Sequence, residues 1–351
     1  MSRLNSEVVV IGGRGFIGRG LVRLLLADGC RVRVVSRSAA RQENDPPELE
    51  YIRGEVGDPD AMMSAIKGAD VVYHLAMGGG ATWADYQRDF VDGTAYVAKA
   101  CMTHGVSRLI YASSTAGLYL GRRGSMDERD GVDSKPELRS MYSRGKILGE
   151  ELLLDLHKKS GLPVVIMRPA VVLGRGGFLA HGGLGYWAND VCCLGWGRSN
   201  HPMPFVLVDD VAQALFLGKD TPGIEGKTFN LVGDVRPTAS EYVRLVAERS
   251  HRNFRFYPQS LLKLQLIEWM KWLLKTMFGR KGVERQSLRD MKSRSMRTQI
   301  DCSEAKRVLG WKPVDSMEVF IREAIDSHLE PLPAGDLRLG HFPLRASGGG
   351  Q

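Results

Sequence analysis

A tyrosine and a lysine four positions apart, Tyr142 and Lys146, form the spacing in this sequence with the clearest chemical meaning. On a helix this spacing places both side chains on one face. A free phenol has a pKa near ~10 and is a poor base at neutral pH. A neighbouring positive charge favours the phenolate and lowers that pKa. The pair could therefore exchange a proton with a substrate hydroxyl, although an ordinary exposed helical pair has the same spacing.

Hydroxyl side chains close a predicted strand upstream of this pair. The strand pattern covers residues 107–112, and Ser113, Ser114 and Thr115 follow it. A hydroxyl at the carboxyl end of a parallel strand faces the ligand crevice of the sheet. Thr115 could then hydrogen-bond a substrate oxygen beside Tyr142. The alternative is a polar strand end that caps the following loop.

Three glycines with the spacing Gly12-x-x-Gly15-x-x-Gly18 lie between the first predicted strand and an amphipathic helix. Glycines at such a turn let backbone N–H groups approach a pyrophosphate at the helix N-terminus. This context favours a dinucleotide site over a merely tight turn.

The end of the second predicted strand indicates which dinucleotide binds. An acidic residue there would bind the ribose 2′-hydroxyl of NAD, whereas this sequence has Ser36 and Arg37, with Arg14 in the glycine loop and Arg41 nearby. Guanidinium groups suit a 2′-phosphate, so NADP(H) is favoured and NAD(H) is the alternative. A solvated surface position is the other interpretation of Arg37.

Strand and helix patterns alternate through the first half of the chain. Strands are predicted at 7–11, 31–36, 49–53, 70–75, 107–112 and 163–168, and helices at 16–28, 59–67, 83–104 and 141–160. This alternation predicts an α/β fold, a Rossmann-type doubly wound parallel sheet with a smaller C-terminal α/β substrate-binding region.

The domain boundaries follow from a change of character after Gly174. We expect a dinucleotide-binding domain over residues 1–173, completed by 204–232, a mainly substrate-binding region over 174–330, and a mobile tail over 331–351. The glycine-rich residues 174–200 predict loops and a short helix around a pocket. Further strand and helix patterns lie at 204–217, 226–232, 238–250, 260–279, 301–309 and 315–328.

With these features in order over residues 7–313, the chain resembles the extended short-chain dehydrogenases/reductases of the NAD-dependent epimerase/dehydratase family. The matching motifs also include Tyr73-His74-Leu75-Ala76, Gly93-Thr94, Arg168-Pro169, Val208-Asp209-Asp210-Val211-Ala212 and Leu309-Gly310-Trp311-Lys312-Pro313. The resemblance implies that Thr115, Tyr142 and Lys146 are catalytic. It implies that Glu55 and Val56 lie by the adenine and that His74 to Ala76 line the dinucleotide, although His74 could also be a core histidine. The expected cofactor site comprises Gly12, Arg14, Gly15, Phe16, Ile17, Gly18, Ser36, Arg37, Glu55, Val56, Leu75, Ala76, Ser113, Tyr142, Lys146, Arg168, Pro169 and Val171.

The chain departs from that family at three informative places. Ala116-Gly117 follow Thr115 where family dehydratases have Asp-Glu, so dehydration lacks its acid and base. Phe90 replaces a usual asparagine. Met203 stands where many nucleotide-sugar members carry an arginine that clamps the diphosphate, a role that Arg168, Arg175 or Arg198 could take.

These features predict an enzyme, an NAD(P)-dependent oxidoreductase or epimerase. The resemblance gives a nucleotide-linked sugar as the expected small-molecule substrate and a 4-epimerase or 4-reductase as the activity. One alternative is a dehydrogenase or reductase of a lipophilic alcohol or ketone, steroid- or terpenoid-like, which Met203 and an apolar helix at 261–278 favour. A non-catalytic NADP-binding regulator or assembly factor is the other alternative, and the trio Thr115, Tyr142 and Lys146 argues against it.

The region 261–297 combines apolar and basic residues. Lys263, Glu268, Lys271 and Lys275 fall on one side of the apolar helix pattern 261–278, and seven basic against two acidic residues lie at 280–297 in a chain of net charge +8. We favour packing of this helix over the substrate pocket or against a second subunit, as in a homodimer. Peripheral membrane contact through 261–297 is the alternative. No nucleic-acid-binding module accompanies the basic residues, so a nucleic-acid partner is not expected.

The cysteines and the N-terminus bear on location. The five cysteines are an odd number without metal-ligand spacing, so no metal site is expected and reducing conditions fit best. No secretory leader and no run of ~18 apolar residues is present. We expect a cytoplasmic enzyme, membrane-associated if 261–297 binds lipid.

Overall fold

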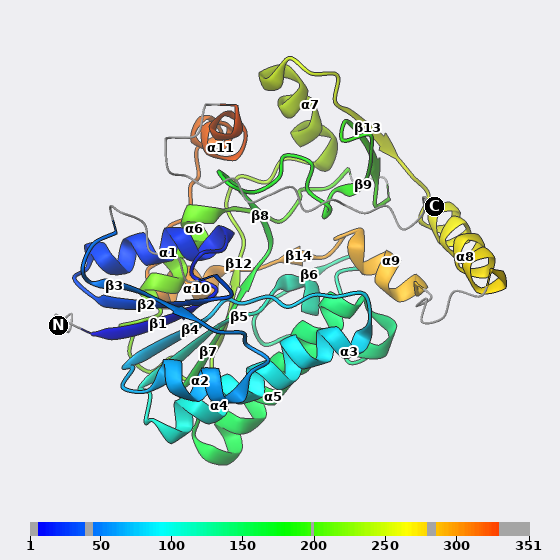
Figure 1. Ribbon diagram of the computed structural model, residues 1–351. Coiled ribbons are helices and arrows are strands. Elements are labelled where there is room, and N and C mark those ends of the chain that lie inside the picture. The colour runs from blue at the N-terminus through cyan, green and yellow to red at the C-terminus, as the bar shows by residue number, and fades with distance from the viewer. Residues whose placement is uncertain (1–5, 39–44, 198–199, 279–285, 330–351) are drawn as a thin grey trace.

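The computed structural model describes residues 6–38, 45–197, 200–278 and 286–329, and a seven-stranded parallel sheet forms its centre (Figure 1). The strand order is β12-β7-β5-β4-β1-β2-β3. The strands are β1 (Glu7–Ile11), β2 (Arg31–Ser36), β3 (Leu49–Arg53), β4 (Val71–His74), β5 (Arg108–Ala112), β7 (Val164–Pro169) and β12 (Thr228–Leu231). The order reverses between β1 and β4, which places the ligand crevice outside the carboxyl ends of these two strands.

Helices cover both faces of this sheet (Figure 1). One face carries α1 (Phe16–Ala27), α6 (Val208–Leu217) and α10 (Ser303–Leu309), and the other carries α2 (Pro59–Ile66), α4 (Gly93–Thr103) and α5 (Met141–Ser160). Side chains alternate across the sheet: Val8 and Val10 join the core under α1, whereas Val9 and Ile11 join the core under α4. Strands buried on both faces explain why their sequences are continuous apolar runs.

The strands and most helices predicted for the first half are confirmed, and so is the Rossmann-type fold class. The predicted helix 83–104 is instead three pieces. It consists of α3 (Trp83–Tyr86), a π-helical segment (Gln87–Asp92) and α4. The extra residue per turn in a π-helical segment rotates the side chains that follow, and such segments are frequent at functional sites.

The prediction of loops and a short helix at 174–200 is wrong for residues 185–195. These residues form an antiparallel hairpin of β9 (Gly185–Ala188) and β10 (Cys192–Gly195), and β13 (Arg255–Pro258) pairs with β10. The hairpin turn places Asn189 and Asp190 at φ 52° and 57°. Asn and Asp tolerate the left-handed region, so this dipeptide was the overlooked signal for a hairpin.

A third apolar core lies in the C-terminal region. It gathers Trp187, Cys193, Met203, Phe205 and Tyr242. The elements around it are β8 (Val171–Leu173), which pairs with β11 (Phe205–Leu207), and the helices α7 (Ala239–Ser250) and α11 (Met317–Ala324).

The last part of the chain returns to the central sheet. After α8 (Leu261–Met277) and α9 (Leu288–Arg294), strand β14 (Gln299–Ile300) pairs with β6 (Ser125–Met126). Trp311 is 1% exposed and donates from its indole nitrogen to the Asp210 carbonyl oxygen at 2.8 Å. The division into domains at residue 173 stays a prediction, and the predicted tail 331–351 lies outside the described residues.

Candidate active site

The glycine loop between β1 and α1 is built for close backbone contact. Gly12 has φ 87°, and a Cβ on it would lie 2.9 Å from the backbone nitrogen of Ala76. A Cβ on Gly18 would lie 2.5 Å from the carbonyl oxygen of Gly12. Gly15 is the N-cap of α1 and offers no side-chain acceptor, so the first-turn N–H groups of the helix remain for an anionic ligand.

Other predicted cofactor residues line the same edge of the sheet. Leu75 and Ala76 follow β4 and pack directly on Gly12. The Phe16 ring lies against Gly177, since a Cβ there would meet it at 2.8 Å. Pro169 ends β7 and Val171 begins β8. Ile17 packs on the core under α1.

Polar groups gather where β2 ends. Arg14 donates from Nη1 to the Ser38 carbonyl oxygen at 3.0 Å, and its guanidinium lies 5.0 Å from the centre of the Tyr51 ring. The Ser36 hydroxyl donates to the same carbonyl at 2.6 Å. Arg37 is exposed beside them. Arg41, predicted to be near this group, lies outside the described residues.

The loop after β3 brings Glu55 and Val56 to the start of α4. A Cβ on Gly93 would lie 2.9 Å from the Val56 carbonyl oxygen, so Gly93 is required for this close approach. Glu55 is exposed and Val56 is half-buried. Both residues follow the carboxyl end of β3, and their expected position beside the adenine stays a prediction.

The start of α5 carries the predicted catalytic tyrosine. Ser140 is the N-cap of α5 and accepts from the Ser143 backbone N–H at 3.3 Å, and Tyr142 is the second helical residue. The Ser114 hydroxyl donates to the Pro169 carbonyl oxygen at 3.4 Å and lies close enough to the Tyr142 phenol to lower its pKa. Thr115 is buried in the turn after β5, and its expected hydrogen bond to a substrate oxygen beside Tyr142 stays a prediction. No separate role was predicted for Ser114, which belongs to the same run of hydroxyl residues.

The electrostatics of Tyr142 differ from the expectation. Burial raises the pKa of the Tyr142 phenol, and the nearby Ser114 hydroxyl opposes that rise. The predicted lowering by a neighbouring ammonium is wrong for the protein alone, because desolvation of the phenolate outweighs the stabilising contacts.

Lys146 is fully enclosed one turn further along α5. Its Nζ donates to the Ala112 carbonyl oxygen at the end of β5, at 2.6 Å, and the Tyr111 ring centre lies 4.8 Å away. Burial lowers the pKa of Lys146 to about 7, against an opposing effect of the Glu150 carboxylate. The amine is therefore poised to gain or lose a proton near neutrality.

An aromatic residue of the π-helical segment packs on this pair. The Phe90 ring meets the Tyr142 ring edge-to-face at 5.8 Å and lies 5.3 Å from Lys146 Nζ. A Cβ on Gly145 would approach Phe90 to 2.9 Å. Gly145, between the tyrosine and the lysine, therefore leaves room for the Phe90 ring against α5.

His74 is a core histidine in the structure. Its Nε2 lies 3.0 Å from the Thr94 hydroxyl, which donates its own proton to the Phe90 carbonyl oxygen at 2.6 Å. Nε2 must therefore carry the hydrogen. Burial, with a smaller effect of Lys146, lowers the pKa of His74 to about 3, so the ring is neutral.

Two residues predicted to bind the cofactor face into the protein instead. Arg168 forms an ion pair with Glu150, and both side chains are buried. The Ser113 hydroxyl donates to the same carboxylate at 2.8 Å. A buried carboxylate needs such partners, so these polar groups are engaged in holding α5 to β5 and β7.

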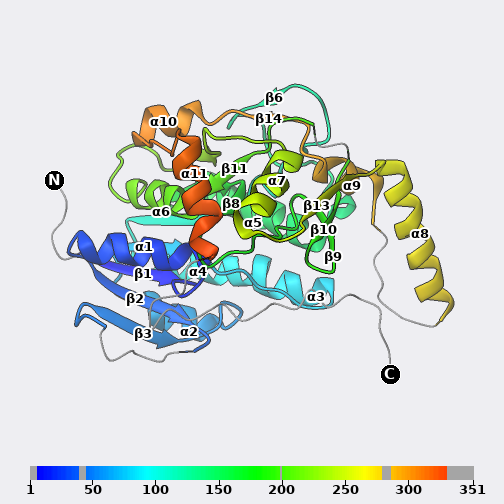
Figure 2. The same cartoon turned by 90° about the horizontal axis from the view of Figure 1, so that it is seen from above.

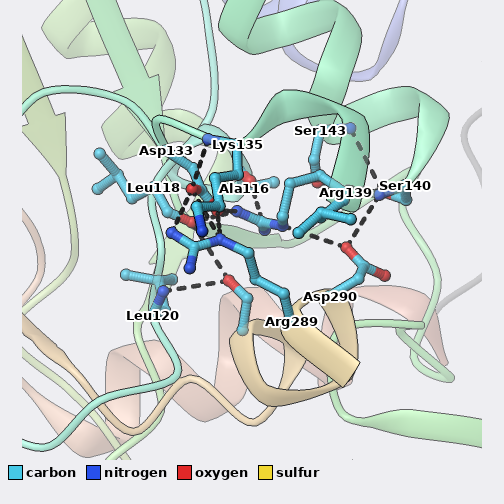
Figure 3. Close-up of polar contacts among 12 residues, drawn as sticks. Ala116, Leu118, Leu120, Asp133, Lys135, Arg139, Ser140, Ser143, Arg289 and Asp290 are labelled. Atoms are coloured by element: carbon cyan, nitrogen blue, oxygen red, sulfur yellow. Dashed lines mark hydrogen bonds and ion pairs between the residues drawn. The ribbon is translucent and has the colours of Figure 1, made fainter. Parts of the chain in front are cut away.

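A buried cluster, which we call the Arg139 clasp, ties α9 to the active site (Figure 3). Arg139 donates to the Asp133 carboxylate at 2.8 Å, to Asp290 at 3.3 Å and to the carbonyl oxygens of Leu118 and Ala116 at 2.9 and 3.0 Å. Asp290 also accepts from the backbone N–H of Ser140 at 3.0 Å. The clasp thus joins the turn containing Thr115 to the N-terminus of α5.

Two arginines that the sequence assigned to a basic patch are paired within this cluster. Arg289 donates to Asp133 at 2.9 Å, and Arg294 donates to Asp290 at 2.7 Å. Although burial raises the pKa of Asp133 and Asp290, hydrogen bonds and charges from the arginines hold both pKa values below their usual range. Arg280, Lys281 and Arg285 of the predicted patch lie outside the described residues.

The proposed diphosphate clamp is replaced by apolar packing. Met203 is 2% exposed in the C-terminal core with Phe205 and Tyr242. Arg168 is engaged with Glu150, Arg198 lies outside the described residues, and the half-buried Arg175 stays a candidate for the role. Position 203, where many nucleotide-sugar members carry the clamping arginine, is therefore part of the hydrophobic interior.

Residues 8–231 match the family model described as the NAD dependent epimerase/dehydratase family. The chain is 32% identical over 180 residues to 2-alkyl-3-oxoalkanoate reductase of Stenotrophomonas maltophilia, covering 48% of this chain and 52% of that protein. It is 27% identical to 3beta-hydroxysteroid-dehydrogenase/decarboxylase isoform 2 of Arabidopsis thaliana, covering 98% of this chain and 66% of that protein. The chain thus spans about half to two thirds of the length of these curated relatives.

Solved structures share the fold. MoeE5 in complex with UDP-glucose and NAD aligns with a TM-score of 0.68 at 24% identity, covering 92% of this chain and 98% of that one. The epimerase Mth375 of Methanothermobacter thermautotrophicus aligns with a TM-score of 0.68 at 19% identity and 92% coverage of both chains. These likenesses agree with the Rossmann-type fold described above.

Proposed function

Because the chain belongs to the NAD-dependent epimerase/dehydratase family, we propose that it is an NAD(P)-dependent oxidoreductase of the extended short-chain type. The observation that carries the proposal is the meeting of Ser114, Tyr142 and Lys146 at the carboxyl end of β5. That end lies on the same sheet edge as the glycine loop, because β4 pairs with both β1 and β5. Proton transfer and dinucleotide binding can therefore occur in one crevice.

The glycine loop fits a dinucleotide. The close approaches at Gly12 and Gly18 leave the backbone without side chains where the pyrophosphate would lie, and the N-terminus of α1 would hold it. Arg14, Ser36 and Arg37 would surround the 2′-position of the adenine ribose, and we therefore propose a preference for NADP(H). When bound, the nicotinamide supplies or accepts the hydride.

The protein groups would handle the proton. Ser114 lies near the Tyr142 phenol and lowers its pKa, and Thr115 begins the next turn. Tyr142 takes the proton of a substrate hydroxyl or returns it to a carbonyl oxygen. Lys146, with its pKa near neutrality, would hold a positive charge close to the phenolate and to the nicotinamide ribose. Lys146 is buried, whereas Tyr142 is half-buried.

For the substrate we propose a secondary alcohol or ketone on an apolar carbon skeleton. Met203 supports this, since its buried side chain offers nothing to a diphosphate. The curated relatives named above are a 2-alkyl-3-oxoalkanoate reductase and a 3beta-hydroxysteroid dehydrogenase/decarboxylase. A nucleotide-linked sugar, the substrate expected from the sequence, is the competing candidate and would need a cation at the diphosphate.

The test is a substrate panel in which alcohols and sugars are assayed with NADP+ or NAD+ and ketones with NADPH or NADH. The panel contains a 3β-hydroxysteroid, a long-chain 3-oxoalkanoate, and UDP-, GDP- and dTDP-linked sugars, with turnover read by nicotinamide absorbance and product analysis. We expect turnover of a lipophilic member. Turnover of sugars alone would contradict the substrate proposal.

Tyr142→Phe tests the catalytic role directly. We expect turnover to fall at least about 100-fold, because the general acid–base group is lost. Dinucleotide binding, measured by calorimetry, should stay within about threefold, since the phenol lies beyond the glycine loop. Full biological activity of this variant would instead support a non-catalytic dinucleotide-binding regulator.

A further inference from the structure

Helix α8 turns its apolar stripe outward. Leu262, Leu266, Trp269, Leu273 and Met277 recur at intervals of three and four residues and therefore share one face. Leu262 is 71% exposed and Met277 is 74% exposed. The other exposed apolar residues of the segment are Ile267, Met270, Leu274 and Phe278. An ordinary surface helix buries its apolar face against the protein, whereas α8 exposes its apolar face to solvent.

Polar contacts on the other side fix this orientation. Lys271 forms an ion pair with Glu268 at 2.8 Å and lies 5.7 Å from the centre of the Tyr186 ring in β9. Gln265 donates to the Gln286 carbonyl oxygen at 2.8 Å. Leu264 is the one buried residue of the helix. The predicted packing of the apolar face over the substrate pocket is therefore wrong for the described residues.

The exposed stripe extends onto the neighbouring helix. A shallow groove of about 310 Å³ runs between α8 and α9 and is lined by Leu262, Gln265, Leu266, Trp269 and Leu288. Leu288 is itself 37% exposed. The groove widens the apolar surface beyond a single row of side chains.

The stripe is long and narrow. A helix of 17 residues is ~26 Å long and ~10 Å wide. A stable interface between two copies of the chain buries about 800 Å² of accessible surface on each partner and needs a surface of complementary shape. A bilayer surface needs no such complementary patch, because binding grows with each apolar side chain inserted.

We propose that α8 is a membrane-docking helix that lies in the plane of an anionic lipid surface with its apolar stripe inserted. Lys263 is exposed beside the stripe, where a lysine can reach lipid headgroups while its methylene chain stays in the interface. Trp269 supplies a side chain typical of the headgroup level. Within the described residues no helix has the length and apolar character to cross a bilayer, so α8 would lie on it.

The position of α8 allows a flat surface to reach it. Figures 1 and 2 both place α8 at the edge of the molecule, beyond the sheet β13-β10-β9. The helix contacts α9, which the Arg139 clasp holds to the active-site side of the protein. Docking through α8 therefore fixes the orientation of the whole body relative to the surface.

The experiment is flotation of the full chain with vesicles of phosphatidylcholine alone or mixed equally with phosphatidylglycerol. We expect the wild type to float with the mixed vesicles. Its binding to the neutral vesicles should be at least about tenfold weaker. The double variant Leu266→Glu/Leu273→Glu should lose at least about tenfold of the binding, since two inserted side chains become charged. The control Met102→Glu/Met317→Glu changes exposed apolar residues of α4 and α11, 39% and 46% exposed, and should float like the wild type.

Three outcomes would overturn the proposal. The first is no flotation with either vesicle type, and the second is equal flotation of the Leu266→Glu/Leu273→Glu variant. The third is a dimer, seen by analytical ultracentrifugation, that this double variant converts to a monomer, because the stripe would then be covered by a second copy. Circular dichroism and turnover of the soluble variant establish that its fold is intact.

Discussion

Replacing Lys146 by methionine should make the protein more stable at neutral pH while removing its proposed activity. The side chain is buried, and burial lowers its pKa from 10.5 to about 7. The difference corresponds to a cost of about 5 kcal/mol for holding the protonated amine in the folded state. Methionine of similar length removes this cost but loses the hydrogen bond to the Ala112 carbonyl oxygen, worth about 1 kcal/mol. We expect a net gain of a few kcal/mol in the free energy of unfolding.

The pH dependence has a definite sign. Between pH 7 and 10.5 the unfolded wild type binds a proton at Lys146 that the folded protein does not, so its free energy of unfolding rises with pH. The advantage of Lys146→Met should be largest near about pH 6 and fall as the pH approaches about 9. Urea unfolding followed by circular dichroism at both pH values measures this, with the exposed Lys158→Met on the same helix as control. A variant less stable than the wild type at about pH 6, or a difference independent of pH, would refute the reasoning.

Two further variants test the clasp and the glycine loop. Asp290→Asn should lower the free energy of unfolding by about 3 kcal/mol at neutral pH, because Arg294 loses its carboxylate partner and Arg139 keeps only one of its two, and turnover should fall as the N-terminus of α5 shifts. Since the folded pKa of Asp290 is below its unfolded value, the wild type loses this stabilisation as the pH falls below about 4, so unfolding curves of the two proteins should converge there. Gly18→Ala should weaken dinucleotide binding at least about tenfold in calorimetry, because its Cβ would lie 2.5 Å from the Gly12 carbonyl oxygen. Gly131→Ala, where nothing lies within 4 Å, should bind like the wild type.

Local patterns were enough to predict the central sheet. Apolar runs such as Val8–Ile11 are buried on both faces, and the run at 7–11 is followed by a turn and an amphipathic helix, so the type and order of these elements follow from the sequence. The hairpin at 185–195 was missed because each strand has four residues, too few for a clear periodicity. Its only strong signal is the dipeptide Asn189-Asp190.

The site was predictable where residues are close in sequence. Tyr142 and Lys146 share one helix, and the glycine loop is one turn, so spacing alone brings their atoms together. The Arg139 clasp joins residues 151 positions apart, and no local pattern encodes that contact. The choice between Ser114 and Thr115 depends on the exact geometry of the turn after β5, which a run of three hydroxyl residues leaves open.

The return of the chain to the central sheet limits how this protein could exchange parts with a relative. Ile300, Leu309 and Trp311 are buried in the core under α1. They lie far along the chain from most of the strands that form this core. A chimera joined once after residue 232 would take these side chains from another protein and leave mismatched volumes beneath β12. Recombination would need two junctions, one after 232 and one before 299, which would make the segment between them a cassette inserted into an otherwise continuous nucleotide-binding body.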